Sequence, residues 1–267
     1  MGDGADSPSI NTSVPHPARI YNVFLGGKDN FAADRQIAEQ TLALFPDIPV
    51  MARQNREFLH RVVRYMVEEA GIDQFLDIGS GLPAEGNVHE IAQELDPEAK
   101  VLYIDNDPLV LVHGQALLAE NGNTKVVTAD LRQVDELLAA VEESGLLDLS
   151  RPVGLMLVAV LHFISDEEDV EGLLRSYLAR LAPGSAMAIS HISPGGADSE
   201  RLDQAVDIYS AATPPGVHLR TAEQVTRLFD GTTLLPPGVV PIADWHPRPG
   251  DDTRPTAATG LGGVGLL

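Results

Sequence analysis

From residue 74 onward, short apolar runs alternate with segments of helical length, and this alternation constrains the fold more than any other feature of the sequence. Strands that are separated by helix-length segments form right-handed βαβ units, and therefore a parallel sheet. The run Pro152–Val160 is continuously apolar, as expected for a central strand buried on both faces. The sequence therefore predicts an α/β domain with a mostly parallel sheet. The expected strands are Gln74–Gly79, Val101–Asp105, Thr124–Thr128, Pro152–Val160 and Ser185–His191, with two late strands near Thr233–Pro241 and Ala257–Val264.

Helical spacing and capping patterns fill the intervals between these runs. Ser165 and Thr221 each begin a capping box, in which the residue three positions later is Glu or Gln. The first of these two helices is expected to end at Pro183-Gly184 and the second at Gly231. The other expected helices are Val88–Leu95, about Pro108 to Glu120, and Val134–Glu143.

The N-terminal region has a different character. Residues 1–15 are expected to be a flexible lead, residues 16–70 a helical cap or lid, and residues 71–267 the α/β domain. Residues 16–64 hold seven of the eighteen Lys and Arg residues of the chain. One hypothesis is that this cap supplies cations to a bound carboxylate, and the alternative is a solvated helix face with i,i+4 partners. On the first hypothesis Tyr21 and Lys28 reach the cofactor, while Arg53, Asn55 and Arg56 bind a carboxylate.

The charge balance excludes several classes of protein. The chain has 39 acidic and 18 basic side chains and a net charge of −21, which argues against binding to phosphate backbones or to anionic membranes. It has no cysteine, so disulfides, thiolate metal sites and cysteine nucleophiles are excluded. No signal peptide is visible, and the longest apolar stretch, Val153–Ile164, is too short to span a bilayer. We therefore expect a cytoplasmic protein with no nucleic-acid partner, no membrane contact and no metal.

A glycine-rich turn follows the first expected strand. Gly79, Gly81 and Ala84 match the loose dinucleotide-binding pattern G-x-G-x-x-[GA], which is weak evidence by itself. Asp77 lies two positions before the first glycine, where a carboxylate would repel a pyrophosphate and would suit the ammonium group of a methionine moiety. Pro83 removes one of the N–H donors that would hold phosphates. The turn therefore favours S-adenosylmethionine over a dinucleotide, and the alternative is a tight turn without a ligand.

Acidic residues also follow the second and third expected strands. Asp105, with Asn106 beside it, can accept hydrogen bonds from both hydroxyls of a ribose. Asp130 can accept from the exocyclic amine of adenine, while the N–H of Leu131 donates to a ring nitrogen. Taken alone, Asp130 could also be a helix cap or a turn residue. Its place after a third successive strand favours the binding role.

Three acids after three strands, the first with Gly-x-Gly, resemble the class I S-adenosylmethionine-dependent methyltransferases. The chain is most similar to a bacterial family of predicted S-adenosyl methyltransferases long carried as a domain of unknown function. This resemblance implies a Rossmann-like fold with a mostly parallel seven-stranded sheet, an antiparallel last strand, helices on both faces and S-adenosylmethionine as cofactor. It also implies that Ala159 lies at the cofactor. Pro83 departs from the superfamily pattern, because a third glycine usually stands there. The motifs that carry the resemblance are Pro15–Arg35, Arg53–Leu59, Gly81–Glu90, Val158–Glu167 and Leu181–Met187.

Two histidines at strand ends are candidate catalytic bases. His162 follows the fourth strand and His191 ends the fifth, and histidine titrates in the useful range. The alternative for each is a histidine that only packs or caps a strand end. We expect methyl transfer to a small-molecule acceptor at oxygen, nitrogen or carbon, with the acceptor atom and the oligomeric state left open. The alternatives are a non-catalytic regulatory protein that binds S-adenosylmethionine or S-adenosylhomocysteine, and a nicotinamide-dependent oxidoreductase.

Overall fold

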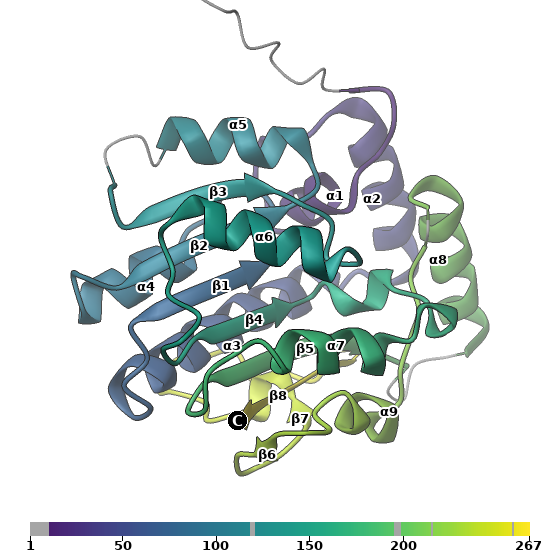
Figure 1. Ribbon diagram of the computed structural model, residues 1–267. Coiled ribbons are helices and arrows are strands. Elements are labelled where there is room, and N and C mark those ends of the chain that lie inside the picture. Colours follow the sequence, from purple (N-terminus) through teal and green to yellow (C-terminus); the bar gives the residue numbers. More distant parts are fainter. Residues whose placement is uncertain (1–10, 118–120, 195–198, 215, 258) are drawn as a thin grey trace, which may run out of the picture.

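The computed structural model describes residues 11–117, 121–194, 199–214, 216–257 and 259–267. Its helices and strands alternate along most of the chain, as the sequence predicts (Figure 1). The N-terminal helices are α1 (Pro17–Phe24), α2 (Ala32–Leu44) and α3 (Ile48–Glu68). The later α-helices are α4 (Val88–Leu95), α5 (Pro108–Leu117), α6 (Val134–Ser144), α7 (Val170–Leu178), α8 (Ser199–Ala212) and α9 (Ala222–Arg227). The strands are β1 (Gln74–Ile78), β2 (Lys100–Asp105), β3 (Thr124–Thr128), β4 (Gly154–Val158), β5 (Ala186–Ser193), β6 (Thr233–Leu234), β7 (Val240–Pro241) and β8 (Thr259–Leu266).

The strands form one eight-stranded sheet in the order β3-β2-β1-β4-β5-β8-β6, and β7 pairs with β8 beside this path. The pairs from β3 to β5 are parallel, and β8 runs antiparallel to β5. The predicted mostly parallel sheet with an antiparallel last strand is therefore confirmed. It has one strand more than predicted, because the late run Thr233–Pro241 forms two separate two-residue strands, β6 and β7.

Helices cover both faces of the sheet, because the side chains of each strand alternate between two apolar clusters. Leu76 and Ile78 of β1 pack with helices α6, α7 and α9, while Phe75 of the same strand packs with α3 and α4. The second half of α3 belongs to this second cluster, where Phe58 and Val62 are fully buried. The C-terminal ends of the parallel strands point toward α1, α2 and α8 (Figure 1). In open parallel sheets this edge is where ligands bind.

Three local expectations need correction. Helix α8 was not predicted. The capping box at Ser165 begins a 3-10 turn, Asp166–Glu168, and α7 begins only at Val170, where Asp169 caps it by accepting from the N–H of Gly172. That helix ends at Leu178, well before Pro183. The expected lead as far as residue 10 and the expected end of α5 at residues 118–120 lie outside the described residues. None of the helices described here is long and apolar enough to cross a membrane.

Candidate functional site

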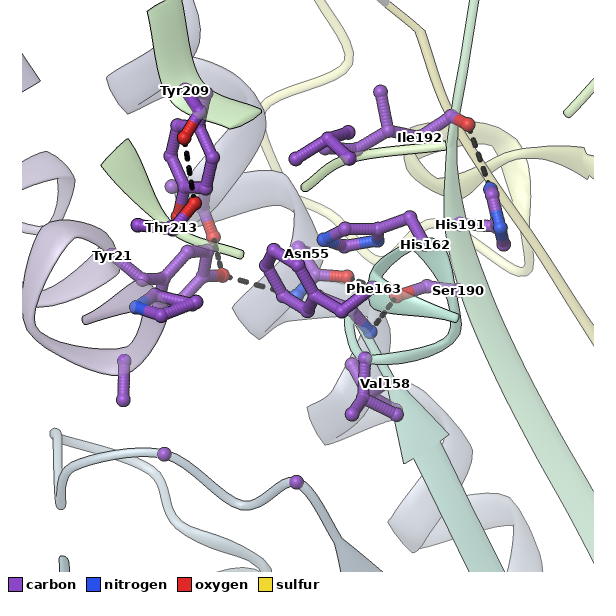
Figure 2. A pocket seen from close by; sticks show the side chains of 18 of the residues that line it. Tyr21, Asn55, Val158, His162, Phe163, Ser190, His191, Ile192, Tyr209 and Thr213 are labelled. Carbon is purple, nitrogen blue, oxygen red and sulfur yellow. Dashed lines mark hydrogen bonds between the residues drawn. The ribbon is translucent and has the colours of Figure 1, made fainter. Parts of the chain in front are cut away.

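A cavity of about 420 Å³ lies at the C-terminal edge of the parallel strands. Its wall includes the segments that follow β1, β2, β3 and β4, together with residues of α1, α2, α3 and α8. Figure 2 shows part of this wall, with His162, Phe163 and Ser190 on the sheet side and Tyr21 and Tyr209 on the helical side. The cavity brings together most residues that the sequence singles out. These are Tyr21, Asp77, Gly79, Gly81, Asp105, Asn106, Asp130, Leu131, Ala159, His162 and His191.

The glycine turn after β1 is tight and partly open to the cavity. Gly79 and Gly81 have φ angles of +73° and +68°, which L side chains rarely adopt. A Cβ on Gly79 would lie 2.3 Å from Cγ2 of Val160, whereas a Cβ on Gly81 would meet nothing within 4 Å. Gly79 is therefore required by packing, and Gly81 leaves space in the cavity wall.

Asp105 holds this turn through one of its oxygens. Its Oδ2 accepts a hydrogen bond from the Gly81 N–H at 2.8 Å, and its Oδ1 accepts from the Asp107 N–H at 2.9 Å. Burial raises the pKa of Asp105, and these two N–H donors act in the opposite direction. Each carboxylate oxygen has a second lone pair, so two further donors can bind here. This is the acceptor geometry that the two hydroxyls of a ribose require.

Asp77 is a buried carboxyl at the end of β1. Burial raises its pKa to about 7, while the Arg56 guanidinium lowers this pKa and the nearby Asp105 raises it. Within the described part of the chain, no hydrogen bond to the Asp77 side chain is found, so the charge of Arg56 offsets the effect of burial only in part. A cation placed beside Asp77 would restore its ionised form.

Arg56 of α3 also lines this end of the cavity. Its NH2 group donates to the carbonyl of Gly86 at 2.7 Å and so holds the segment after the glycine turn. Its Nε and the Oγ of Ser80 are buried without a hydrogen-bond partner among the described residues. Buried polar atoms of this kind indicate a place where a polar ligand binds.

Asp130 and Leu131 lie at the end of β3. The Asp130 carboxylate already accepts from the Arg132 N–H at 2.9 Å and from its guanidinium at 3.2 Å. The N–H of Leu131 has no partner in the described ranges, so it is available to a ring nitrogen. Asn106 is exposed at the cavity wall beyond Asp105.

A chain of hydrogen bonds connects the N-terminal helices to the sheet (Figure 2). The Tyr21 hydroxyl donates to the carbonyl of Ala52 at 3.1 Å and accepts from Asn55 Nδ2 at 3.0 Å. Asn55 Oδ1 accepts from Ser190 Oγ at 2.6 Å, and Ser190 Oγ accepts from the Ala159 N–H at 2.9 Å. Ala159 has a φ of +58°, a strained conformation for alanine that persists only where its surroundings hold it. This network fixes the backbone after β4 against α1 and α3.

The two candidate histidines have different surroundings. His191 Nδ1 donates to the carbonyl of Ile192 at 2.7 Å, and its Nε2 accepts from the Arg220 guanidinium at 2.8 Å. Burial lowers the pKa of His191 to about 4. Both nitrogens of His191 are therefore occupied, and the ring holds the buried Arg220, which also donates to the carbonyls of Leu161 and Ile164.

His162 lies in the 3-10 turn Leu161–Phe163 after β4. None of the described residues forms a hydrogen bond with either of its ring nitrogens, and its Nδ1 is buried. Burial, and next the neighbouring His191, lower the pKa of His162 well below its ordinary value. The ring is therefore neutral near pH 7, and neither of its nitrogens is engaged by a described residue.

Two predicted residues do not reach the cavity. Lys28 and Arg53 are exposed and do not contribute to its wall. Three further residues of the site were not predicted from the sequence. Phe163 lines the cavity, Ser190 joins the network described above, and Arg220 supports His191.

Comparisons with known structures define the class of this fold. A S-adenosylmethionine-dependent methyltransferase from Anabaena variabilis superposes with a TM-score of 0.53 at 16% identity, over 96% of this chain and 97% of that one. At this identity the similarity concerns the fold alone. The fold is that of the class I S-adenosylmethionine-dependent methyltransferases, as the sequence predicts.

The family model described as S-adenosyl methyltransferase matches residues 3–267, and the chain belongs to this family. A Thermobifida fusca protein, provisionally assigned as a methyltransferase, is 38% identical over 99% of both chains, with a TM-score of 0.90. A DUF574 family protein from Streptomyces avermitilis is 38% identical over 97% of this chain and 99% of its own, also with a TM-score of 0.90. No curated protein matches the sequence. The protein is a S-adenosylmethionine-dependent methyltransferase.

The residues of the cavity fit this cofactor. The free lone pairs of Asp105 suit the ribose hydroxyls, and the buried Asp77, which accepts no hydrogen bond from the described residues, suits an ammonium group. The unpartnered Nε of Arg56 and Oγ of Ser80 suit a carboxylate. When bound, S-adenosylmethionine supplies an electrophilic methyl group on a positively charged sulfur.

Proposed function

We propose that the protein transfers the methyl group to a small-molecule acceptor bound in the same cavity. One observation carries this proposal: the cavity extends past the cofactor residues into an apolar chamber between α2, α8 and the 3-10 turn Leu161–Phe163. We call this part the acceptor chamber, and its wall includes Phe45, Phe163, Leu202, Val206, Tyr209 and Leu219. Concave apolar pockets with few polar groups are typical of small-molecule sites. The absence of nucleic-acid and membrane partners and the cytoplasmic location predicted from the sequence belong to the same proposal.

The hypothesis of a non-catalytic regulatory protein predicts cofactor residues without an acceptor pocket. The acceptor chamber counts against it, and so does membership of a methyltransferase family. The nicotinamide hypothesis rests only on the loose glycine pattern, and the buried Asp77 beside the turn disfavours a pyrophosphate.

In this proposal Asp105 binds the ribose and Asp77 the ammonium group. The sequence predicts a carboxylate role for Arg53, Asn55 and Arg56, and in this proposal Arg56 takes it, because Arg56 lines the cavity and Arg53 does not. The backbone N–H of Leu131 donates to a ring nitrogen of the adenine, and the carboxylate of Asp130 accepts from its amine. Ala159 and Tyr21 complete the cofactor wall.

Alanine substitutions at Gly79 and Gly81 test whether the turn after β1 forms the wall of the cofactor site. Gly79→Ala should lower the free energy of unfolding by about 2–4 kcal/mol, because it adds left-handed strain and a clash with Val160. Gly81→Ala adds the strain alone and should lower the free energy of unfolding by about 1–2 kcal/mol. Its methyl group would enter the open space of the cavity that the ligand needs, so it should weaken S-adenosylhomocysteine binding. Urea unfolding and calorimetric titration separate the two effects. Equal losses of stability in the two variants would contradict this assignment.

Cofactor affinity should depend on the ionisation of Asp77. Its pKa of about 7 applies to the ligand-free protein, and a bound ammonium group favours the carboxylate and lowers this pKa in the complex. A proton therefore competes with the ligand below pH 7. S-adenosylhomocysteine should bind about tenfold more weakly at pH 6 than at pH 8. Calorimetric titrations across this range should show the slope in the wild-type protein and a flat profile in Asp77→Asn.

His162 is the candidate base, because its ring nitrogens are free and those of His191 are occupied. We expect His162→Gln to lower kcat by about 100-fold, near the low end for general-base catalysis because a histidine of low pKa is a weak base. Cofactor affinity should not change. The measurement follows S-adenosylhomocysteine formation in the presence of candidate acceptors. An unchanged kcat in this variant would show that His162 is not the base. The rate enhancement would then come from the alignment of the acceptor with the methyl group.

A further inference from the structure

The face that α8 turns toward the cavity has no charge. Leu202, Ala205, Val206 and Tyr209 line the cavity at positions i, i+3, i+4 and i+7, which form one stripe of a helix. The acidic residues of α8, such as Asp203 and Asp207, are exposed on the opposite side. The helix thus keeps its charges away from the chamber, although the chain as a whole carries a net charge of −21.

The rest of the acceptor chamber is equally uncharged. Phe45 packs with Leu202 and Ala205, and Leu219 packs against this cluster. The charged side chains in the described wall of the cavity, such as Asp77, Asp105 and Arg56, follow the strands or line the cofactor end. Arg132 donates to the carbonyl of Phe163, but its guanidinium is already paired with Asp130 and Glu168. A charged group in this chamber would therefore have no free counter-ion, and burying an unpaired charge is costly. The occupant is therefore uncharged.

Two aromatic rings in the chamber have nearly parallel planes. The rings of Phe163 and Tyr209 make an angle of 24°, and their centroids are 6.2 Å apart. This separation is near the wide end of the range of about 4.5–7 Å found for ring pairs, so a small opening would admit a flat guest. Phe163 follows His162 directly, and the two rings are 4.3 Å apart between centroids. A flat molecule between Phe163 and Tyr209 would thus lie beside the free imidazole.

We infer that the acceptor is a planar, uncharged compound with a hydroxyl group, of the neutral phenol class, whose ring lies between Phe163 and Tyr209 and whose hydroxyl faces His162. This inference rests on the proposed transfer to a small molecule. In the reaction a lone pair of the hydroxyl oxygen forms the new O–C bond, and the C–S bond breaks with its electron pair remaining on sulfur. The hydroxyl proton moves to a ring nitrogen of His162 and then to solvent. The products are a methyl ether and S-adenosylhomocysteine.

Binding to the full-length protein saturated with S-adenosylhomocysteine tests the acceptor class without turnover. The probes are 2-naphthol, which is planar and neutral, 2-naphthoate, which is planar and charged, and 1-decanol, which is neutral and flexible. We expect 2-naphthol to bind about tenfold more tightly than either of the others, because the charge is unpaired and the flexible chain must be ordered. In Tyr209→Leu the preference for 2-naphthol over 1-decanol should fall below about threefold, because one ring face is lost. Thr226→Leu, on the exposed side of α9, is the matched control and should keep the wild-type preference.

The same samples with S-adenosylmethionine separate this inference from the proposed function. Preferential binding of 2-naphthol with formation of its methyl ether supports both. Preferential binding of 2-naphthol without methylation of any small molecule would show that neutral phenols bind in the chamber, but it would overturn the proposed function. Equal or tighter binding of 2-naphthoate or 1-decanol overturns the inference, even where another small molecule is methylated.

Discussion

Asp105→Ala should weaken the binding of S-adenosylhomocysteine about a thousandfold, since two hydrogen bonds to a charged acceptor contribute about 3–6 kcal/mol together. Asp105 also holds the glycine turn through the N–H of Gly81, so the substitution removes both a ligand contact and the support of the cavity wall. Calorimetric titration gives the affinity, and near-UV circular dichroism shows whether the variant keeps its fold.

Asp130→Ala is the matched control for this prediction. Asp130 is also a carboxylate at a strand end in the cavity wall, but Arg132 already neutralises it by two hydrogen bonds. Its net contribution to a ligand should be that of one hydrogen bond, about 1 kcal/mol, or somewhat under tenfold. A folded Asp105→Ala protein that binds the ligand within threefold of wild type would contradict the ribose assignment. Equal losses in the two variants would show that position at a strand end, rather than the free lone pairs, determines the effect.

The three acids could be predicted from the sequence because parallel strands bring their C-terminal ends to one edge. β1, β2 and β3 are adjacent in the sheet, so Asp77, Asp105 and Asp130 lie along one wall of the cavity. The antiparallel last strand came from the resemblance alone, since no periodicity in the sequence gives strand direction.

The face of α3 on which an arginine lies determines whether it lines the cavity. Ala52, Asn55, Arg56 and Leu59 line the cavity at positions i, i+3, i+4 and i+7 of α3, and Arg53 lies outside this stripe. The sequence contained this signal, but α3 also buries Phe58 and its neighbours against the sheet, so two apolar stripes overlap in one helix. A single periodic pattern does not show which stripe faces a ligand.

Other parts of the site could not be predicted from the sequence, because they depend on contacts between segments that are distant in the chain. Arg220 donates to His191 and to the carbonyl of Leu161, residues that lie 29 and 59 positions away in the chain. Helix α8 carries Leu202, Ala205, Val206 and Tyr209 at helical spacing, so its sequence does contain a signal for a helix.

The largest loss of stability should come from removing the buried cation that fastens α1 to the sheet. Arg19 Nε and NH2 donate to the two oxygens of Asp107, each at 2.9 Å, and the side chains are only 5% and 0% exposed. Arg19→Met leaves the Asp107 carboxylate buried without this partner, so the free energy of unfolding should fall by about 3–5 kcal/mol. Urea unfolding followed by circular dichroism gives this value.

Arg180→Met is the matched control, because Arg180 pairs with Asp135 at 2.9 Å while both side chains are exposed, at 57% and 86%. Exposed pairs contribute about 0–1 kcal/mol, so this variant should unfold almost as the wild type does. The two variants should also differ in cofactor affinity. The Asp107 N–H donates to Asp105, so displacement of Asp107 disturbs the ribose acceptor, whereas Arg180 has no contact with the cavity wall. Similar unfolding free energies for the two variants would show that α1 does not depend on the buried pair. A loss of stability in Arg19→Met without a loss of affinity would show that the ribose site keeps its geometry independently of α1.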